Sequence, residues 1–200
     1  MVRCASVVLL LVIGCPALGE EAAAIAAIED LHATLVGAMK EAKSLGYDGR
    51  YARVQPAVEQ HFDLDFMARF VLGPGGKELS ADDQQRWRTA FEALTIATYA
   101  GRFNGYGGEQ FRTLGAEAGA GDSLFVRTVL DRPDADDVQL TYRLHRANGA
   151  WRIADIYQQG TVSELALRRS EYATVLNRDG FAKLLARVDA KTAEYAKAGC

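Results

Sequence analysis

The sequence predicts an α+β domain in which a curved, four-stranded antiparallel meander is covered on one face by amphipathic helices that enclose an apolar cavity. The first half of the chain repeats apolar residues at helical spacing, residues 111–158 contain runs of alternating polarity, and helical spacing returns after them. This order of elements is expected when helices gather on one face of an antiparallel sheet. A cavity between the sheet and the helices is where we expect the function to lie.

The first residues have the layout of a secretory signal peptide. Arg3 is followed by an uncharged run over residues 4–13 and then by a small-x-small site at residues 17–19. The run is too short to span a membrane, which takes about 20 residues. We therefore expect residues 1–19 to be removed and residues 20–200 to form a single domain in the periplasm, because no repeat, low-complexity tract or linker interrupts them.

A second interpretation of the leader places the protein on a membrane. Val12-Ile13-Gly14-Cys15 resembles the lipobox of bacterial lipoproteins, which would leave a lipidated Cys15 at the mature N-terminus. Cleavage near Gly19 is the prediction, because the site there is adequate, and anchoring at Cys15 is the alternative. The two forms share a compartment and differ in whether the protein diffuses.

Composition limits the function classes. Hydrophobic residues make up 49% and charged residues 24% of the chain, which is typical of a globular protein. The formal net charge of −3 becomes −4 when Arg3 is lost with the leader, and this balance argues against nucleic acid as a partner. Only Cys200 of the three cysteines survives cleavage at Gly19, so no internal disulfide can form and one apolar core must hold the domain.

The helices of the first half are predicted from apolar spacing and from capping residues. Residues 25–39 carry one apolar stripe, and residues 51–62 fit a second, shorter helix. Asp63 is placed to cap a third helix. Ser80 and Asp83 have the spacing of a capping box at the start of a longer amphipathic helix.

Four runs of alternating polarity predict the meander. Asn148-Gly149 between two of them is a strong hairpin signal, because both residues accept the positive φ of a tight turn. The runs cover residues 111–117, 124–131, 138–145 and 151–158, and two helical stretches follow over residues 165–176 and 181–188.

Patterns of catalytic or metal-binding residues are weak. His61, Asp63 and Asp65 form the most enzyme-like group, but this spacing brings three side chains to one face only in a strand, and the neighbouring residues predict a helix entry. No nucleophile elbow or His-Glu-x-x-His pair is present in the sequence. We expect no catalytic residue, no metal site and no cofactor, and a small α+β hydrolase using His61 and Asp155 is an alternative.

Two parts of the chain resemble a known family. Residues 58–73 with the following Gln85-Arg86-Trp87, and residues 142–172 with their Gly149-Ala150-Trp151 turn, are similar to the MlaC/toluene-tolerance family. The resemblance implies a periplasmic carrier that holds phospholipid tails between a curved sheet and helices. It also implies an inner-membrane ABC-type lipid transport complex as partner, and an outer-membrane acceptor as a second one.

One segment departs from the usual family pattern. An extra residue lies between Gly160 and Ser163, and Leu167-Arg168 replaces the usual Asn-Tyr. This variant resembles the hopanoid-associated branch known as HpnM, which implies a hopanoid as cargo in place of a phospholipid. A membrane-tethered envelope assembly factor without ligand is a further alternative.

A carrier of this kind needs a dry cavity with an opening. A lipid of about 30 carbons faces on the order of 20 kcal/mol for leaving a membrane unaided, at about 0.8 kcal/mol per CH2. Arg168 and Arg169 are candidates for contact with a headgroup or partner, because guanidinium groups match phosphate oxygens, and a solvated face with Glu164 paired to Arg168 is the alternative. The expected lining residues, which would equally serve a solid core, are Val126, Leu140, Tyr142 and Ile153 from the sheet and Phe91, Leu94 and Leu165 from the helices.

Overall fold

The computed structural model describes residues 16–198 of the chain. Over these residues it contains helices, one short 3-10 turn and a single antiparallel sheet with strand order β1-β2-β3-β4-β5. The elements are α1 (Pro16–Lys40), α2 (Ala42–His61), α3 (Leu64–Leu72), η1 (Pro74–Glu78), α4 (Ala81–Arg102), β1 (Gln110–Ala118), β2 (Ser123–Asp131), β3 (Val138–Ala147), β4 (Ala150–Gln158), β5 (Val162–Ser163), α5 (Glu164–Asp179) and α6 (Phe181–Ala198).

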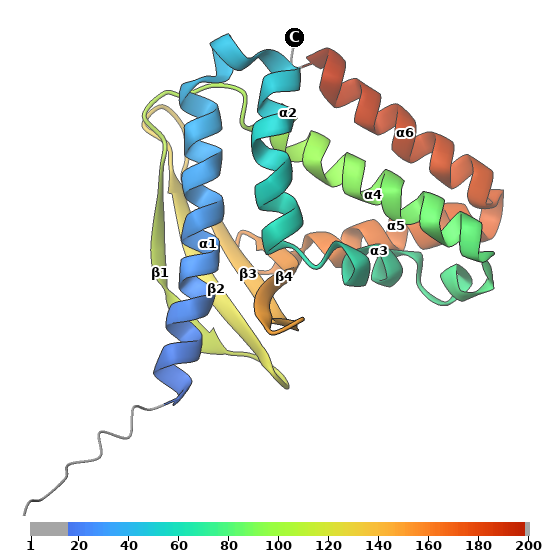
Figure 1. Cartoon of the computed structure of the whole chain (residues 1–200), viewed down its shortest axis with the longest axis horizontal. Helices are drawn as coiled ribbons and strands as arrows, with labels where there is room; N and C mark the ends of the chain where they lie inside the picture. Colours follow the sequence, from blue (N-terminus) through green and yellow to red (C-terminus); the bar gives the residue numbers. More distant parts are fainter. Residues whose placement is uncertain (1–15, 199–200) are drawn as a thin grey trace, which may run out of the picture.

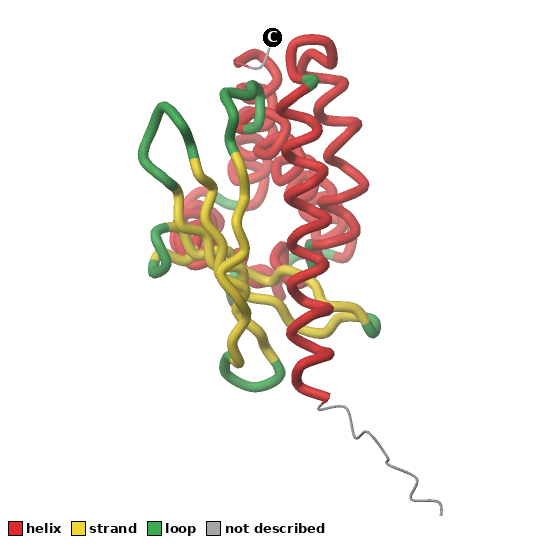
Figure 2. Tube along the Cα trace, turned by 90° about the vertical axis from the view of Figure 1, so that its left-hand side faces the viewer, coloured by secondary structure: helices red, strands yellow, loops and turns green. Residues whose placement is uncertain are grey.

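The helices lie in two groups around the sheet. α1 runs across one face of the strands with α2 beside it, and α3 to α6 gather beyond the β4 edge (Figure 1). A view from the side shows the strands strongly twisted, with α1 along one face (Figure 2).

The predicted fold class is confirmed, with one strand more than predicted. The first four strands begin and end within two residues of the predicted runs. The fifth strand pairs Ser163 with Tyr157 and Val162 with Gln158 at the end of β4. A strand of two residues has no alternating pattern, so the sequence could not reveal it.

The residues of α1 explain why this helix is a core element. Ile28, Leu31 and Leu35 recur at helical spacing and are fully buried. The segment Gly19–Lys40 is long and apolar enough to cross a membrane by length and composition alone. Because its apolar stripe is buried against the rest of the protein, we interpret it as the core helix of a folded domain.

The start of α1 overlaps the predicted leader. Cleavage after Gly19 would remove the first turn and leave Glu20, whose carboxylate accepts hydrogen bonds from Arg146 and Trp151 at the far end of the sheet. The bond from Arg146, and then that from Trp151, lowers the pKa of Glu20. Most of the predicted leader, including Arg3 and Cys15, lies outside the described residues, as does Cys200.

The helix α2 begins nine residues earlier than the predicted residue 51 because tertiary contacts outweigh the polar composition of its first turns. Gly46 kinks it with a φ of 61°, a conformation that glycine adopts without strain. The buried Arg50 donates to the carbonyls of Ala42 and Ala100, at 3.1 and 2.9 Å. One guanidinium thus ties this turn to α4.

The predicted cap of α3 is confirmed, and it also anchors the helix to the sheet. Asp63 Oδ1 accepts from the backbone N–H of Phe66 at 2.9 Å, and Oδ2 accepts from His145 Nε2 at 2.8 Å. The backbone N–H of Asp63 donates to Ile153 O at 3.0 Å. The junction between α2 and α3 is therefore fixed to β3 and β4.

A neutral histidine joins α1 to the inner face of the sheet. His32 Nε2 lies 2.9 Å from the hydroxyl of Tyr142, and the His32 ring stacks on Phe111 with the ring centroids 3.7 Å apart. Burial lowers the pKa of His32 from 6.5 to about 3. The imidazole is therefore uncharged at neutral pH.

This pKa predicts how stability depends on pH. Between about pH 6.5 and pH 3 the unfolded chain binds a proton at His32 that the native protein does not, so the free energy of unfolding falls as the pH falls. The contribution is complete above pH 6.5 and is lost below it, with a slope that approaches about 1.4 kcal/mol per pH unit. Urea unfolding from about pH 7.5 to about pH 5 should give a steeper pH dependence for the wild type than for His32→Gln. Equal slopes would contradict the buried neutral state.

Candidate functional site

A cavity of about 300 Å³ lies between the inner face of the sheet and the helices α4 and α5. The sheet contributes the end of β2, the start of β3 and the end of β4, and α4 contributes its second half. Most of its walls are apolar, and they contain Phe62, Met67, Tyr99, Phe103, Leu130, Val138, Leu140, Tyr142, Ile156 and Leu165.

Two threonines in the α4 wall satisfy their own hydroxyl groups. Thr95 Oγ1 donates to Phe91 O at 2.8 Å, and Thr98 Oγ1 donates to Leu94 O at 2.7 Å. A hydroxyl bonded to the preceding turn of its own helix needs no partner in the cavity. This wall can therefore face hydrocarbon without an unsatisfied polar atom.

Aromatic rings form a continuous layer beside the cavity. Tyr99 lies edge-on to Phe62 at 5.4 Å and stacks on Phe103 at 5.8 Å between ring centroids. Burial raises the pKa of Tyr99 well above its usual value and also raises that of Tyr142. Both phenols therefore stay neutral and contribute uncharged surface.

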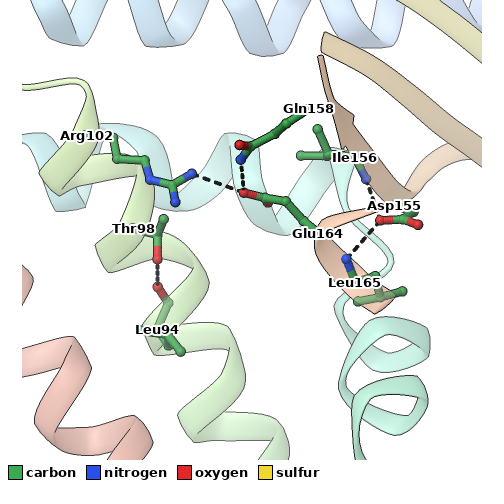
Figure 3. A network of polar contacts seen from close by, with 8 residues as sticks. All are labelled: Leu94, Thr98, Arg102, Asp155, Ile156, Gln158, Glu164 and Leu165. Carbon is green, nitrogen blue, oxygen red and sulfur yellow. Dashed lines mark hydrogen bonds and ion pairs between the residues drawn. The ribbon is translucent and has the colours of Figure 1, made fainter. Parts of the chain in front are cut away.

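Two charged side chains that line the cavity, Arg102 and Glu164, are paired with each other (Figure 3). Glu164 Oε1 accepts a hydrogen bond from Arg102 Nη1 at 3.2 Å and another from Gln158 Nε2. Burial, which lowers the pKa of Arg102, is outweighed by the charge and hydrogen bond of Glu164, so the net shift of this pKa is upward. Because half of the Arg102 side chain is exposed, at 51%, this ion pair marks the mouth.

A buried carboxylate fixes the α5 wall to the sheet. Asp155 Oδ1 accepts from the backbone N–H groups of Ile156 at 2.8 Å and Leu165 at 3.1 Å (Figure 3). Its other oxygen accepts from Ser163 Oγ at 2.6 Å, and Ser163 in turn caps α5 by accepting from Ala166 N at 2.9 Å. The bonds from Ser163 and Leu165 thus fix the start of α5 to the end of β4.

The two arginines that the sequence singled out lie in different places. Arg168 lines the cavity, half-buried, with its guanidinium carbon 5.9 Å from the centroid of the Phe91 ring. Arg169 covers the Phe70 ring at 4.7 Å in the contact between α3 and α5, away from the cavity. The predicted pairing of Glu164 with Arg168 is absent from the described hydrogen bonds and ion pairs, because Glu164 binds Arg102 instead.

The structure separates the predicted lining residues into two sets. Leu140, Tyr142 and Leu165 line the cavity together with Arg168. Phe91, Val126 and Ile153 are 0% exposed in the packed core, and Leu94 lines a second hollow between α4, α5 and α6.

Several residues of the site carry no sequence signal that marks them as lining a cavity. Tyr99 and Phe103 have the spacing of neighbours on one helix face, but α4 is buried on most sides and the pattern does not indicate which side meets a cavity. Arg102, Gln158 and Glu164 lie far apart in sequence and meet only because β4 ends beside the C-terminus of α4.

The residues of the enzyme alternative have structural partners. His61 Nε2 donates to Asp30 at 2.7 Å, which joins α2 to α1, and Asp155 is bound to the start of α5. No hydrogen bond joins His61 to Asp155 among residues 16–198. Within the same range, no group of three His, Cys, Asp or Glu side chains is placed to hold a metal ion.

Comparison with known proteins identifies the family. The family model described as MlaC protein matches residues 29–190. The chain belongs to the MlaC family. A solved structure of the phospholipid-binding protein from Ralstonia solanacearum, in complex with a phospholipid, has the same fold, with a TM-score of 0.74 and 21% sequence identity over 88% of this chain and 98% of that one. A search of curated proteins finds no match.

The cavity of this MlaC-family protein predicts unequal costs for two leucines on the same face of β3. Leu144 is fully buried in the packed core, so Leu144→Ala should cost about 2–5 kcal/mol of unfolding free energy. Leu140 borders existing empty space, so Leu140→Ala should cost clearly less. Urea unfolding of both variants measures the difference, and equal costs would indicate a solid core at Leu140.

Proposed function

We propose that this MlaC-family protein is a periplasmic carrier that takes up a membrane lipid by its tail and moves it between membranes. The observation that carries the proposal is the mainly apolar cavity, in which Thr98 and Asp155 satisfy their polar atoms within the protein and Arg102 pairs with Glu164. Such a site offers hydrocarbon a dry surface and offers a headgroup an exit to water. The family and the phospholipid-binding neighbour support the same conclusion.

The size of the cavity sets what it can enclose without rearrangement. A volume of about 300 Å³ is at the lower end for small-molecule sites and equals roughly ten water volumes. This is room for part of one acyl chain. Uptake of a two-chain lipid therefore requires α5 to separate from the sheet or the lipid to use further space.

A carrier also needs partners that load and unload it. The proposed partners are an inner-membrane ABC-type lipid transport complex and an outer-membrane acceptor, as the family resemblance implies. A diffusible form is required, which favours cleavage near Gly19 over a tether at Cys15. Phospholipid is the proposed cargo and a hopanoid the alternative.

A ligand-free assembly factor would also fold this way, and lipid analysis separates the two functions. We expect organic extraction of the purified protein, followed by mass spectrometry, to recover a lipid in defined stoichiometry. A purified protein that yields no lipid on extraction would favour the assembly factor.

Filling the cavity should prevent lipid uptake. Leu140→Trp places an indole in the space beside β3, so the variant should remain folded and carry several-fold less extracted lipid than the wild type. Leu114→Trp is the matched control, because Leu114 lies on β1, is 52% exposed and does not line the cavity. Full lipid load in folded Leu140→Trp would count against this cavity as the binding site.

Export is tested by the mass of the mature protein. Fractionation of cells followed by intact-mass measurement should yield a periplasmic product that begins at Glu20. A product that retains Met1 in the cytoplasm would contradict export, and a diacylglycerol-modified Cys15 would replace the diffusible form by the tethered one.

A further inference from the structure

A second hollow adjoins the lipid cavity. It has a volume of about 440 Å³ and lies between α4, α5 and α6. Thr98 and Arg168 line both spaces, so these two residues form the partition between them. The second hollow is more polar than the cavity, because five of its eleven lining residues are charged.

Every charged side chain that lines the two spaces, except Arg168, has a hydrogen-bond or ion-pair partner among residues 16–198. In the second hollow Arg187 binds Glu171 and Lys191 binds Glu194, both at 2.7 Å. At the cavity rim Glu164 binds Arg102, as described above. Arg168 has no hydrogen bond or ion pair within residues 16–198, and its contact there is the face of the Phe91 ring.

An unpaired, half-buried guanidinium favours an anion as ligand. Removing a charge from water is costly unless a counter-charge compensates it, and Arg168 is partly removed from water. The carboxylates that line the same two spaces, Glu164, Glu171 and Glu194, are bound to Arg102, Arg187 and Lys191. The planar guanidinium offers parallel N–H donors that fit two oxygens of a phosphate or a carboxylate. Arg168 is therefore prepared for an anionic oxygen group at the boundary between an apolar and a polar space.

We infer that Arg168 binds the anionic group of the lipid, with the tail in the cavity beside β3 and the remainder of the headgroup in the hollow between α4, α5 and α6. An amphiphile presents its tail, its anion and its polar head in this order, and the molecule offers apolar cavity, Arg168 and polar hollow in the same order. The inference rests on the proposed carrier function. It assigns the cargo to lipids with a phosphate or carboxylate and against uncharged polycyclic lipids.

Calorimetric titration with three probes that share one acyl chain tests the anion site. The probes are a lysophosphatidylglycerol, the free fatty acid and the uncharged monoacylglycerol, each below its micelle concentration. The wild type should bind the two anionic probes about tenfold more tightly than the uncharged one, as a charge-assisted hydrogen bond provides. Arg168→Gln should reduce this preference to about twofold or less, and Arg168→Lys should restore part of it. The control is Arg178→Gln, because Arg178 is exposed in the last turn of α5 and is paired with Asp179, so this variant should keep the full preference.

The outcomes separate the anion site from the carrier function. Preference for the lysophospholipid alone identifies a phosphodiester as the bound group, and equal preference for the fatty acid identifies any anionic oxygen group. If the wild type binds all three probes with the same affinity, or if Arg168→Gln keeps the full preference for the anionic probes, the anion site is refuted and the carrier function stands. If the wild type binds none of them, the carrier function itself fails.

A second variant tests where the headgroup lies. Ala190 on α6 lines the hollow, so Ala190→Trp should fill it and weaken the binding of the lysophospholipid at least about tenfold. The fatty acid has no further headgroup, so its affinity should not change. Ala182→Trp, two turns earlier on the same helix and exposed, is the control and should change neither affinity. Unchanged lysophospholipid affinity in folded Ala190→Trp would place the headgroup outside this hollow.

Discussion

The Asp155 carboxylate accepts hydrogen bonds from the backbone N–H groups of Ile156 and Leu165 and from Ser163 Oγ, and these bonds fix the first turn of α5 to the end of β4. Leu165 in this turn and Arg168 in the next line the cavity, so the position of the cavity wall depends on where α5 begins. Asp155 is only 5% exposed, and a buried carboxylate is tolerated because its hydrogen bonds replace those of water. A residue that could be taken for a catalytic acid is thus a structural anchor, and the cavity exists because α5 starts where it does.

Hydrogen bonds between the surrounding helices and the sheet explain why the cavity does not collapse into a solid core. Hydrogen bonds away from the cavity hold the helices that surround it. Trp87 Nε1 donates to Ala68 O at 2.8 Å and joins α4 to α3. Asp63, which follows α2, is bound to the sheet, and Arg50 within α2 is bound to α4. Arg102 and Glu164, which line the cavity, are partly exposed to water. The interior needs no further polar group, because the hydroxyls of its wall are satisfied within α4.

Local signals in the sequence predicted the elements well. Asn148-Gly149 forms the predicted turn with φ values of 51° and 79°, and Asp63 and Ser80 cap their helices through the backbone N–H groups of Phe66 and Asp83. The start of α2 could not be predicted, because it depends on Arg50 reaching a carbonyl of α4. The cavity lining was predicted only in part for a related reason: Val126 and Leu140 lie on the same face of the sheet, and only the position of the helices decides that one is packed and the other faces open space.

A crystal structure of the protein purified with its natural lipid tests the carrier proposal most directly. We expect continuous density for an acyl chain between Leu140 on β3 and Tyr99 on α4, with its polar end beside Arg168. Widening of the space between α5 and the sheet would accompany a second chain. A cavity that holds only ordered water, or a lipid bound on another surface of the molecule, would contradict the proposal.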